Sequence, residues 1–354
     1  MRWLLHGRAA AGLCEMRFGG AVGAVLVAMT VAACQPVAPA SDPVVDPPAP
    51  PAERLPQPDR QAELRAARAE RNRAANEAAI RASAQASSAS QTQRDFYARA
   101  EQRLLAEGRL RRDRAPADIR IDPETLAGNF VQIALRDEYT RRDGALVPET
   151  RLAPLRRWQA PVRLQPEFGA STDLAQQRAW RAEIAQFADR LTAASGHPVR
   201  LAADQGNFII LVVTEDERRE IGPRLDQLVP GIPPEDVAIL RALPPAISCT
   251  VFAYSEAGSP VYSRAVAVIR AELPRLLRSS CIEEELAQGM GLANDSPTAR
   301  PSVFNDDEEF ARVTRHDELL LRILYDSRLR PGMTEVEALP IVRQIAKELI
   351  GEAT

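Results

Sequence analysis

The stretch that decides the fold reads CIEEELAQGMGLANDS over residues 281–296, and PSVFND follows it over residues 301–306. Its first part has helical spacing, because Glu284 and Gln288 are four residues apart and share one helix face. Gly291 then allows the chain to leave the helix in a left-handed conformation. The stretch therefore predicts a helix end at which oxygen-bearing side chains converge, namely Glu284, Glu285, Gln288, Asn294 and Asp295.

The same stretch resembles the motif of the metzincin zinc proteases, H-E-x-x-H-x-x-G-x-x-H, which is followed by a turn that contains methionine. On this motif Glu285 stands at the catalytic glutamate, and Gly291 at the glycine. The three histidine positions hold Glu284, Gln288 and Asn294. The resemblance therefore extends to the spacing of the motif but not to its zinc ligands.

The segment after the helix resembles the metzincin turn, since Phe304 in the run Ser302-Val303-Phe304 stands in the place of the methionine. The expected order of a long helix, strands and then this helix also fits that family. The resemblance implies an α+β, zincin-like fold with a mixed sheet and long helices, over roughly residues 155–330. It also implies a polar pocket, lined by Glu284, Glu285, Gln288, Asn294 and Asp295.

Loss of the three histidines argues against zinc chemistry. Catalytic zinc needs three protein ligands and an open position, and only His197 and His316 remain outside the export segment. Without zinc, no water molecule acquires a pKa near 7, so Glu285 would have nothing to deprotonate. We expect no metal ion, no cofactor and a non-catalytic cleft. The alternative is a peptidase-like hydrolase that uses an oxygen-rich metal site, with Glu285 as general base.

The wider pattern resembles a bacterial family of secreted and lipid-anchored proteins, domain of unknown function 2927. The resemblance rests on Glu284-Glu285-Leu286-x-Gln288, Gly291-Leu292, Asn294-Asp295, Pro301-Ser302-x-Phe304-Asn305-Asp306, His316-Asp317-Glu318 and Arg330-Pro331-Gly332. The family has no assigned activity, so the resemblance implies fold and location only. A simpler interpretation stays open, in which residues 283–285 are an acidic helix start and residues 294–297 a turn.

The first residues have the order of a bacterial export signal. A positive end at Arg17 precedes an apolar run over residues 21–31, and Val31-Ala32-Ala33-Cys34 follows. The run is shorter than the roughly 20 residues of a membrane span. The end resembles a lipobox, which implies that Met16 is the true start, that residues 1–33 are removed and that Cys34 carries lipid. Gln35 favours the outer membrane, with the protein facing the periplasm.

Two further segments precede the globular part. Residues 34–59 are rich in proline and predict a semi-rigid spacer. Residues 60–115 are rich in alanine and arginine, with few large apolar residues, and predict a solvated helical stalk. A second alternative function is therefore an envelope scaffold that acts through this stalk.

Residues 120–354 predict one globular α+β domain. Asp122-Pro123 has the form of a helix start, a long amphipathic helix ends at Gly196, and the run Phe208–Val213 predicts a buried strand. Further helices are expected around residues 235–241, 278–292, 314–325 and 334–350, with strands at 157–164, 199–201, 249–254 and 261–269.

Two cysteines remain once Cys14 and Cys34 are assigned to the export segment. Cys249 and Cys281 would meet in an oxidising compartment, so we expect a disulfide. It would close a loop of about 30 residues and contribute about 3–4 kcal/mol. Two buried free thiols are the alternative.

The charge balance bears on partners. The formal net charge is −3, which gives no reason to expect a nucleic-acid partner. We expect the membrane as a partner through the lipid on Cys34, together with an envelope protein or a glycan.

Overall fold

The protein is described by a computed structural model that covers residues 4–5, 8–9, 60–142, 145–305 and 307–351. Cys34, the proline-rich spacer and most of the expected signal segment lie outside these residues. The chain divides into two compact units, one of residues 11–70 and the other of residues 1–10 and 71–354. No helix in the described part is long and apolar enough to cross a membrane.

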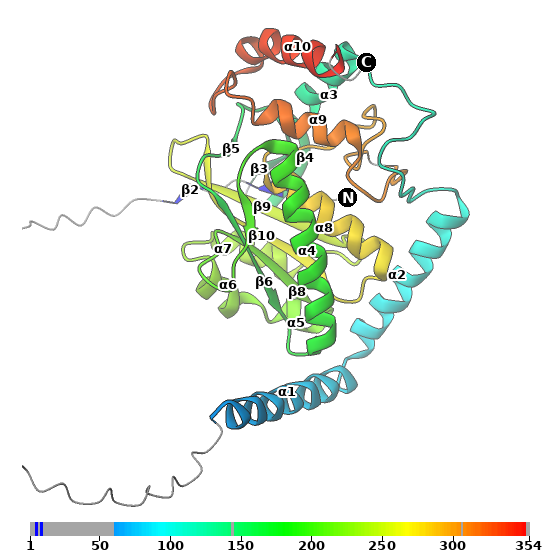
Figure 1. Cartoon of the computed structure of the whole chain (residues 1–354), viewed down its shortest axis with the longest axis vertical. Helices are drawn as coiled ribbons and strands as arrows, with labels where there is room; N and C mark the ends of the chain where they lie inside the picture. The colour runs from blue at the N-terminus through cyan, green and yellow to red at the C-terminus, as the bar shows by residue number, and fades with distance from the viewer. Residues whose placement is uncertain (1–3, 6–7, 10–59, 143–144, 306, 352–354) are drawn as a thin grey trace, which may run out of the picture. The chain divides into compact units, whose positions relative to one another are not determined.

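A sheet in the order β7–β6–β8–β10–β9 forms the centre of the larger unit (Figure 1). Strands β7, β6, β8 and β10 are parallel, whereas β9 is antiparallel to β10. A short strand, β5, also pairs with the start of β10. The bounds are β5 Arg157–Trp158, β6 Val162–Phe168, β7 Val199–Leu201, β8 Phe208–Val213, β9 Cys249–Glu256 and β10 Val261–Arg270. The predicted α+β class is confirmed.

The central strand β8 is buried on both faces, as its unbroken apolar run predicted. Because successive side chains alternate in a strand, Phe208 and Ile210 join one apolar cluster while Ile209 and Leu211 join another. Helices α4 and α8 contribute to the first cluster, and α6 and α7 to the second. Their bounds are α4 Leu174–Ser195, α6 Gly222–Leu228, α7 Pro234–Arg241 and α8 Arg275–Gly289; α5, Glu215–Arg219, directly follows β8.

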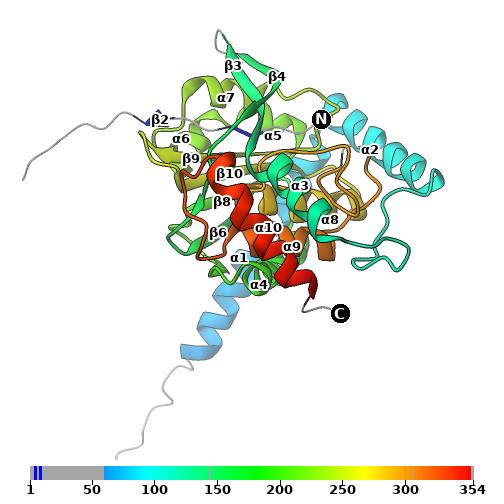
Figure 2. The ribbon, with the colours of Figure 1, turned by 90° about the horizontal axis from the view of Figure 1, so that it is seen from above.

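Three further helices extend the first apolar cluster (Figure 2). They are α3 Pro123–Ala134, α9 Arg315–Leu324 and α10 Glu335–Gly351. Asp122 caps α3 as predicted, because its Oδ1 accepts a hydrogen bond from the Thr125 N–H at 2.9 Å. The capping box of α10 also forms, with the Thr334 N–H donating to Glu337 at 2.8 Å.

A two-stranded hairpin was not predicted. It consists of β3 Arg136–Arg142 and β4 Ala145–Leu152 and forms a separate sheet (Figure 2). Its sequence has many charged residues and no clear alternation of apolar side chains. The hairpin therefore lacks the period-two pattern by which a strand is identified.

The outer edge of β9 is paired with the beginning of the chain. Strands β1, Leu4–Leu5, and β2, Arg8–Ala9, lie parallel to β9, with Leu4 opposite Val251 and Arg8 opposite Ser255. These residues belong to the segment that the sequence predicts to be removed on export. The edge of the sheet is therefore covered by a part of the chain that the mature protein is expected to lack.

The first two helices differ from the expected stalk. Helix α1, Arg60–Ala84, is exposed along most of its length, as expected. Helix α2, Ser88–Ala106, instead packs on the globular domain. Tyr97 is buried there, and its hydroxyl donates to the carbonyls of Pro245 at 2.8 Å and Ile247 at 3.1 Å. Tyr97 also belongs to the first apolar cluster, and Leu104 packs against it, so both polar and apolar contacts hold α2 on the domain.

Glu101 makes the second anchor of α2. Its Oε2 accepts hydrogen bonds from the backbone N–H groups of Leu276 and Leu277, each at 3.0 Å. These groups lie in the first turn of α8, where N–H groups have no partner within the helix. A carboxylate at this position also interacts favourably with the helix dipole.

We predict that Glu101→Ala lowers the free energy of unfolding by about 1–2 kcal/mol, because two backbone donors lose their acceptor. Urea unfolding followed by circular dichroism measures the change. Asp95→Ala is the matched control, since Asp95 is exposed on the same helix. An equal loss in both variants would contradict the proposed anchor.

Candidate functional site

The predicted motif helix is α8, which follows β10 and packs against β9, β10 and α4. From Leu276 to Gly289 every side chain except that of Arg278 is buried. The helix ends at Gly289, slightly earlier than expected, and Gly291 follows with a φ of +124°. A Cβ atom at Gly291 would lie 2.4 Å from the carbonyl oxygen of Arg156, so this position requires glycine.

Glu283 is at the centre of a cluster of ion pairs. It pairs with Arg114 at 2.7 Å, Arg312 at 2.7 Å and Arg190 at 3.4 Å. The backbone N–H of Val313 also donates to it at 2.8 Å. Burial raises the pKa of the Glu283 carboxyl, and the charges of Arg312 and Arg190 act in the opposite direction. This glutamate joins segments that are far apart in the sequence.

The two glutamates of the motif itself are fully buried. Glu284 and Glu285 each have 0 % of their surface exposed. Burial of a carboxylate costs several kcal/mol unless charges or hydrogen bonds compensate. Neither glutamate lines the cavity near Thr172 or the one near Arg315. The polar pocket expected at Glu284 and Glu285 remains a prediction.

The remaining predicted pocket residues separate into two groups. The side-chain amide of Gln288 donates to Asp295 at 3.1 Å, so these two side chains meet as expected. Asn294 is instead directed at α3, where its amide donates to the carbonyl of Gln132 at 2.8 Å. Its own N–H donates to the carbonyl of Ile133 at 3.0 Å. Asn294 thus fixes the loop after α8 to α3.

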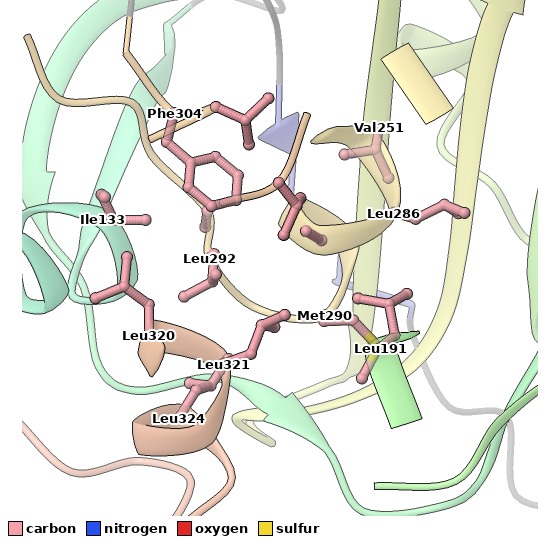
Figure 3. Packing of buried hydrophobic residues seen from close by; sticks show 14 of the residues in the cluster. Ile133, Leu191, Val251, Leu286, Met290, Leu292, Phe304, Leu320, Leu321 and Leu324 are labelled. Carbon is pink, nitrogen blue, oxygen red and sulfur yellow. The ribbon is translucent and has the colours of Figure 1, made fainter. Parts of the chain in front are cut away.

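The predicted turn lies in the interior. Phe304 is 0 % exposed and packs near Ile133 and Leu292 (Figure 3). Its N–H donates to the Ser302 hydroxyl at 3.1 Å, and the Ser302 hydroxyl in turn donates to Asp317. The turn therefore holds the segment after α8 against the first turn of α9.

His316 and Asp317 form a buried polar group that sequence reasoning missed. The side chain of His316 is 0 % exposed. Its Nε2 lies 2.9 Å from the side-chain nitrogen of Asn129, and its Nδ1 lies 3.4 Å from Asp317. Asp317 also accepts from the N–H groups of Thr314 at 2.8 Å and Val303 at 3.1 Å. The Thr314-x-x-Asp317 capping box was the available signal for this arrangement.

The cysteine pair is disulfide-bonded in the structure. Cys249 in β9 is joined to Cys281 in α8, with 5.9 Å between the Cα atoms. This separation lies within the usual range for a disulfide. The bond ties the motif helix to the edge strand of the sheet.

Among the residues that the structure describes, no group of three or more His, Cys, Asp or Glu side chains is arranged to hold a metal ion. The motif region consists of buried acids and amides on α8, a tight loop fixed by Asn294 and Asp317, and the strand β9 beside the helix. The acids and amides of this region can form hydrogen bonds and ion pairs.

We predict that Asp317→Asn destabilises the protein by about 2 kcal/mol, because a buried carboxyl group that accepts several hydrogen bonds is lost in the interior. Asp307→Asn, an exposed position of the same connecting segment, serves as the control and should change stability little. Chemical denaturation measures both. Equal stability of Asp317→Asn and the natural protein would show that the Ser302–Asp317 contact does not hold the turn.

One comparison with known proteins gives a match. The family described as Protein of unknown function (DUF2927) matches residues 123–344, which is more than half of the chain. No curated protein and no solved structure matches. The metzincin likeness therefore rests on the spacing of the motif and the order of the elements, and stays a prediction.

Proposed function

The chain belongs to the family described as Protein of unknown function (DUF2927), and because that description assigns no activity, we propose a function from the structure. The protein is a lipid-anchored binding module of the bacterial cell envelope that takes up an extended peptide along the outer edge of β9. The observation that carries the proposal is the parallel pairing of residues 4–5 and 8–9 with that edge.

The hydrogen-bonding direction of β9 supports this role. The Arg270 N–H donates to the carbonyl of Ser248 on the β9 side, whereas the Ala265 N–H donates to Asn207 on the β8 side. Along a strand, successive residues direct their backbone N–H and C=O groups alternately to one neighbouring strand and to the other. Val266 of β10 therefore bonds to β9, and the residue opposite it there is Phe252. The backbone groups of Val251 and Ala253 then point away from the sheet. They form a row of donors and acceptors that suits another extended chain.

The mature chain would have this edge open. Residues 4–9 precede Met16, the expected true start, and also fall within residues 1–33, so in either case the mature chain lacks β1 and β2 and β9 lacks that partner. An open edge strand readily pairs with a strand of another chain. Repeated backbone donors and acceptors match a peptide better than a glycan, so of the two expected partners we favour a protein segment.

Helix α8 lies beside this strand. Val251 on β9 packs against the helix, since a Cβ atom built on Gly289 would lie 3.3 Å from its Cγ2. Because Glu284 and Glu285 of this helix are fully buried, the backbone groups of β9, and not these carboxylates, would make the contacts with the peptide.

The first test of this proposed function concerns the lipid anchor. Cys34→Ala should abolish labelling by radioactive palmitate and shift the protein from the membrane to the soluble fraction, because a diacyl anchor is lost. Cys14→Ala is the matched control, since it lies in the segment expected to be absent. Undiminished labelling of the Cys34→Ala variant would refute the anchor at Cys34.

The peptide site gives the second prediction. The mature chain, purified in detergent, should bind a synthetic peptide with the sequence of residues 1–12, measured by fluorescence anisotropy. Ala253→Pro should weaken binding at least tenfold, since proline removes an outward N–H without removing a bond to β10. Ala253→Ser keeps the N–H and should bind as the natural chain does.

Mass spectrometry of the same peptide distinguishes the proposed binding function from the hydrolase alternative. An intact peptide after incubation supports binding alone. Cleavage that is lost in Glu285→Gln would replace the proposal with the hydrolase alternative. Equal binding by Ala253→Pro and Ala253→Ser, with both variants folded by circular dichroism, would rule out the edge of β9 as the site.

A further inference from the structure

A cavity of about 410 Å³ lies at the carboxyl ends of three neighbouring parallel strands. Residues 170–172 follow β6, residues 214–217 follow β8 and residues 271–273 follow β10, and members of each segment line it. Ligands of open α/β sheets bind at this end of the strands. The cavity has the size of a small-molecule site, and none of the predicted motif residues lines it.

Thr172 presents an unsatisfied polar group in this wall. Its side chain is 5 % exposed, and its Oγ1 has no hydrogen-bond partner among the described residues. A buried hydroxyl without a partner destabilises the folded protein, because its hydrogen bonds to water are lost and not replaced. Such groups call for a specific explanation, and a ligand that accepts and donates hydrogen bonds provides one.

Arg278 is held in place on the same wall. Its guanidinium carbon lies 5.0 Å from the ring centroid of Trp180, and its Nη2 lies 3.1 Å from Glu183. Its Nε is buried and has no hydrogen-bond partner among the residues described. The stacking and the ion pair orient the guanidinium plane, so that little side-chain entropy remains to be lost when a ligand binds.

The free hydrogen-bond donors of the wall suit an anionic group. Arg94 of α2 lines the cavity, is exposed and forms no ion pair with an acidic residue of the described chain. The two acids of the wall, Asp216 and Glu217, keep their charge but use carboxylate oxygens to accept backbone N–H groups. Asp216 accepts from the Ser87 N–H at 2.9 Å, and Glu217 accepts from the N–H groups of Ser171 at 2.8 Å and Thr214 at 2.9 Å. The donors left for a ligand are therefore those of Arg94, Arg278 and Thr172.

We propose that this cavity binds a small organic anion. Its carboxylate or phosphate group meets Arg94, Arg278 and Thr172, and its apolar body contacts Trp180 and Leu273. The elbow between α1 and α2, at residues 82–86, forms another part of the wall. Ligand binding therefore stabilises the docked position of α2. The site is independent of the peptide edge at β9.

The test uses the mature chain in detergent with benzoate, hexanoate and inorganic phosphate as probes, and benzamide and hexanamide as neutral counterparts. Calorimetry and thermal unfolding at constant ionic strength measure binding. At least one anion should bind with a submillimolar Kd and raise the Tm, whereas the matched amides should not. Amides that bind as tightly as the acids, or the absence of binding by all three anions, would overturn the proposal.

Variants locate the site. Arg94→Gln and Thr172→Val should each weaken anion binding at least tenfold, while Arg99→Gln, exposed on the same helix, should not. Thr172→Val should keep or raise the Tm without ligand, because it removes an unsatisfied buried hydroxyl. If the Thr172 hydroxyl served only to stabilise the fold, its removal would lower the Tm. Unaltered binding by both Arg94→Gln and Thr172→Val would disprove the site, and Ala253→Pro should leave anion binding unchanged.

Discussion

The burial of α8 depends on the ion cluster around Glu283. A carboxylate in the interior is costly unless its partners compensate fully. Here three guanidinium groups surround it, contributed by Arg114 after α2, Arg190 on α4 and Arg312 before α9. Charge-assisted hydrogen bonds of this kind are among the stronger polar contacts in proteins. They allow a helix with three consecutive glutamates to lie between the sheet and α4, and they position everything that follows α8.

The residues that define the family pattern serve mainly to fix the loop after that helix. Asn294 bonds to α3, Gln288 bonds to Asp295, and the Ser302 hydroxyl bonds to Asp317 at the start of α9. Each contact joins two segments that do not share a secondary-structure element. A loop held in this way keeps one conformation, which a binding surface needs because ordering on binding would cost entropy. The motif therefore has an architectural role beside any role in binding.

The sequence predicted the features that local chemistry decides. The apolar run of β8 and the helix start at Asp122 each act within a few residues, and both form. The docking of α2 could not be predicted, because Tyr97 and Glu101 find their partners about 150 and 175 residues further along the chain. The burial of His316 was missed for the same reason, since its partner Asn129 lies 187 residues away. The hairpin β3–β4 was missed because its strands lack an alternation of apolar side chains.

The cavity near Thr172 is a proposed binding site that could not be predicted from the sequence either. Its wall combines loops after three strands with the elbow of two N-terminal helices, and no motif marks such a combination. Helix α2 therefore has two roles, since Glu101 caps the motif helix and Arg94 faces the cavity. Any ligand that binds at the elbow of residues 82–86 thus acts on the contacts that hold α2 on the domain.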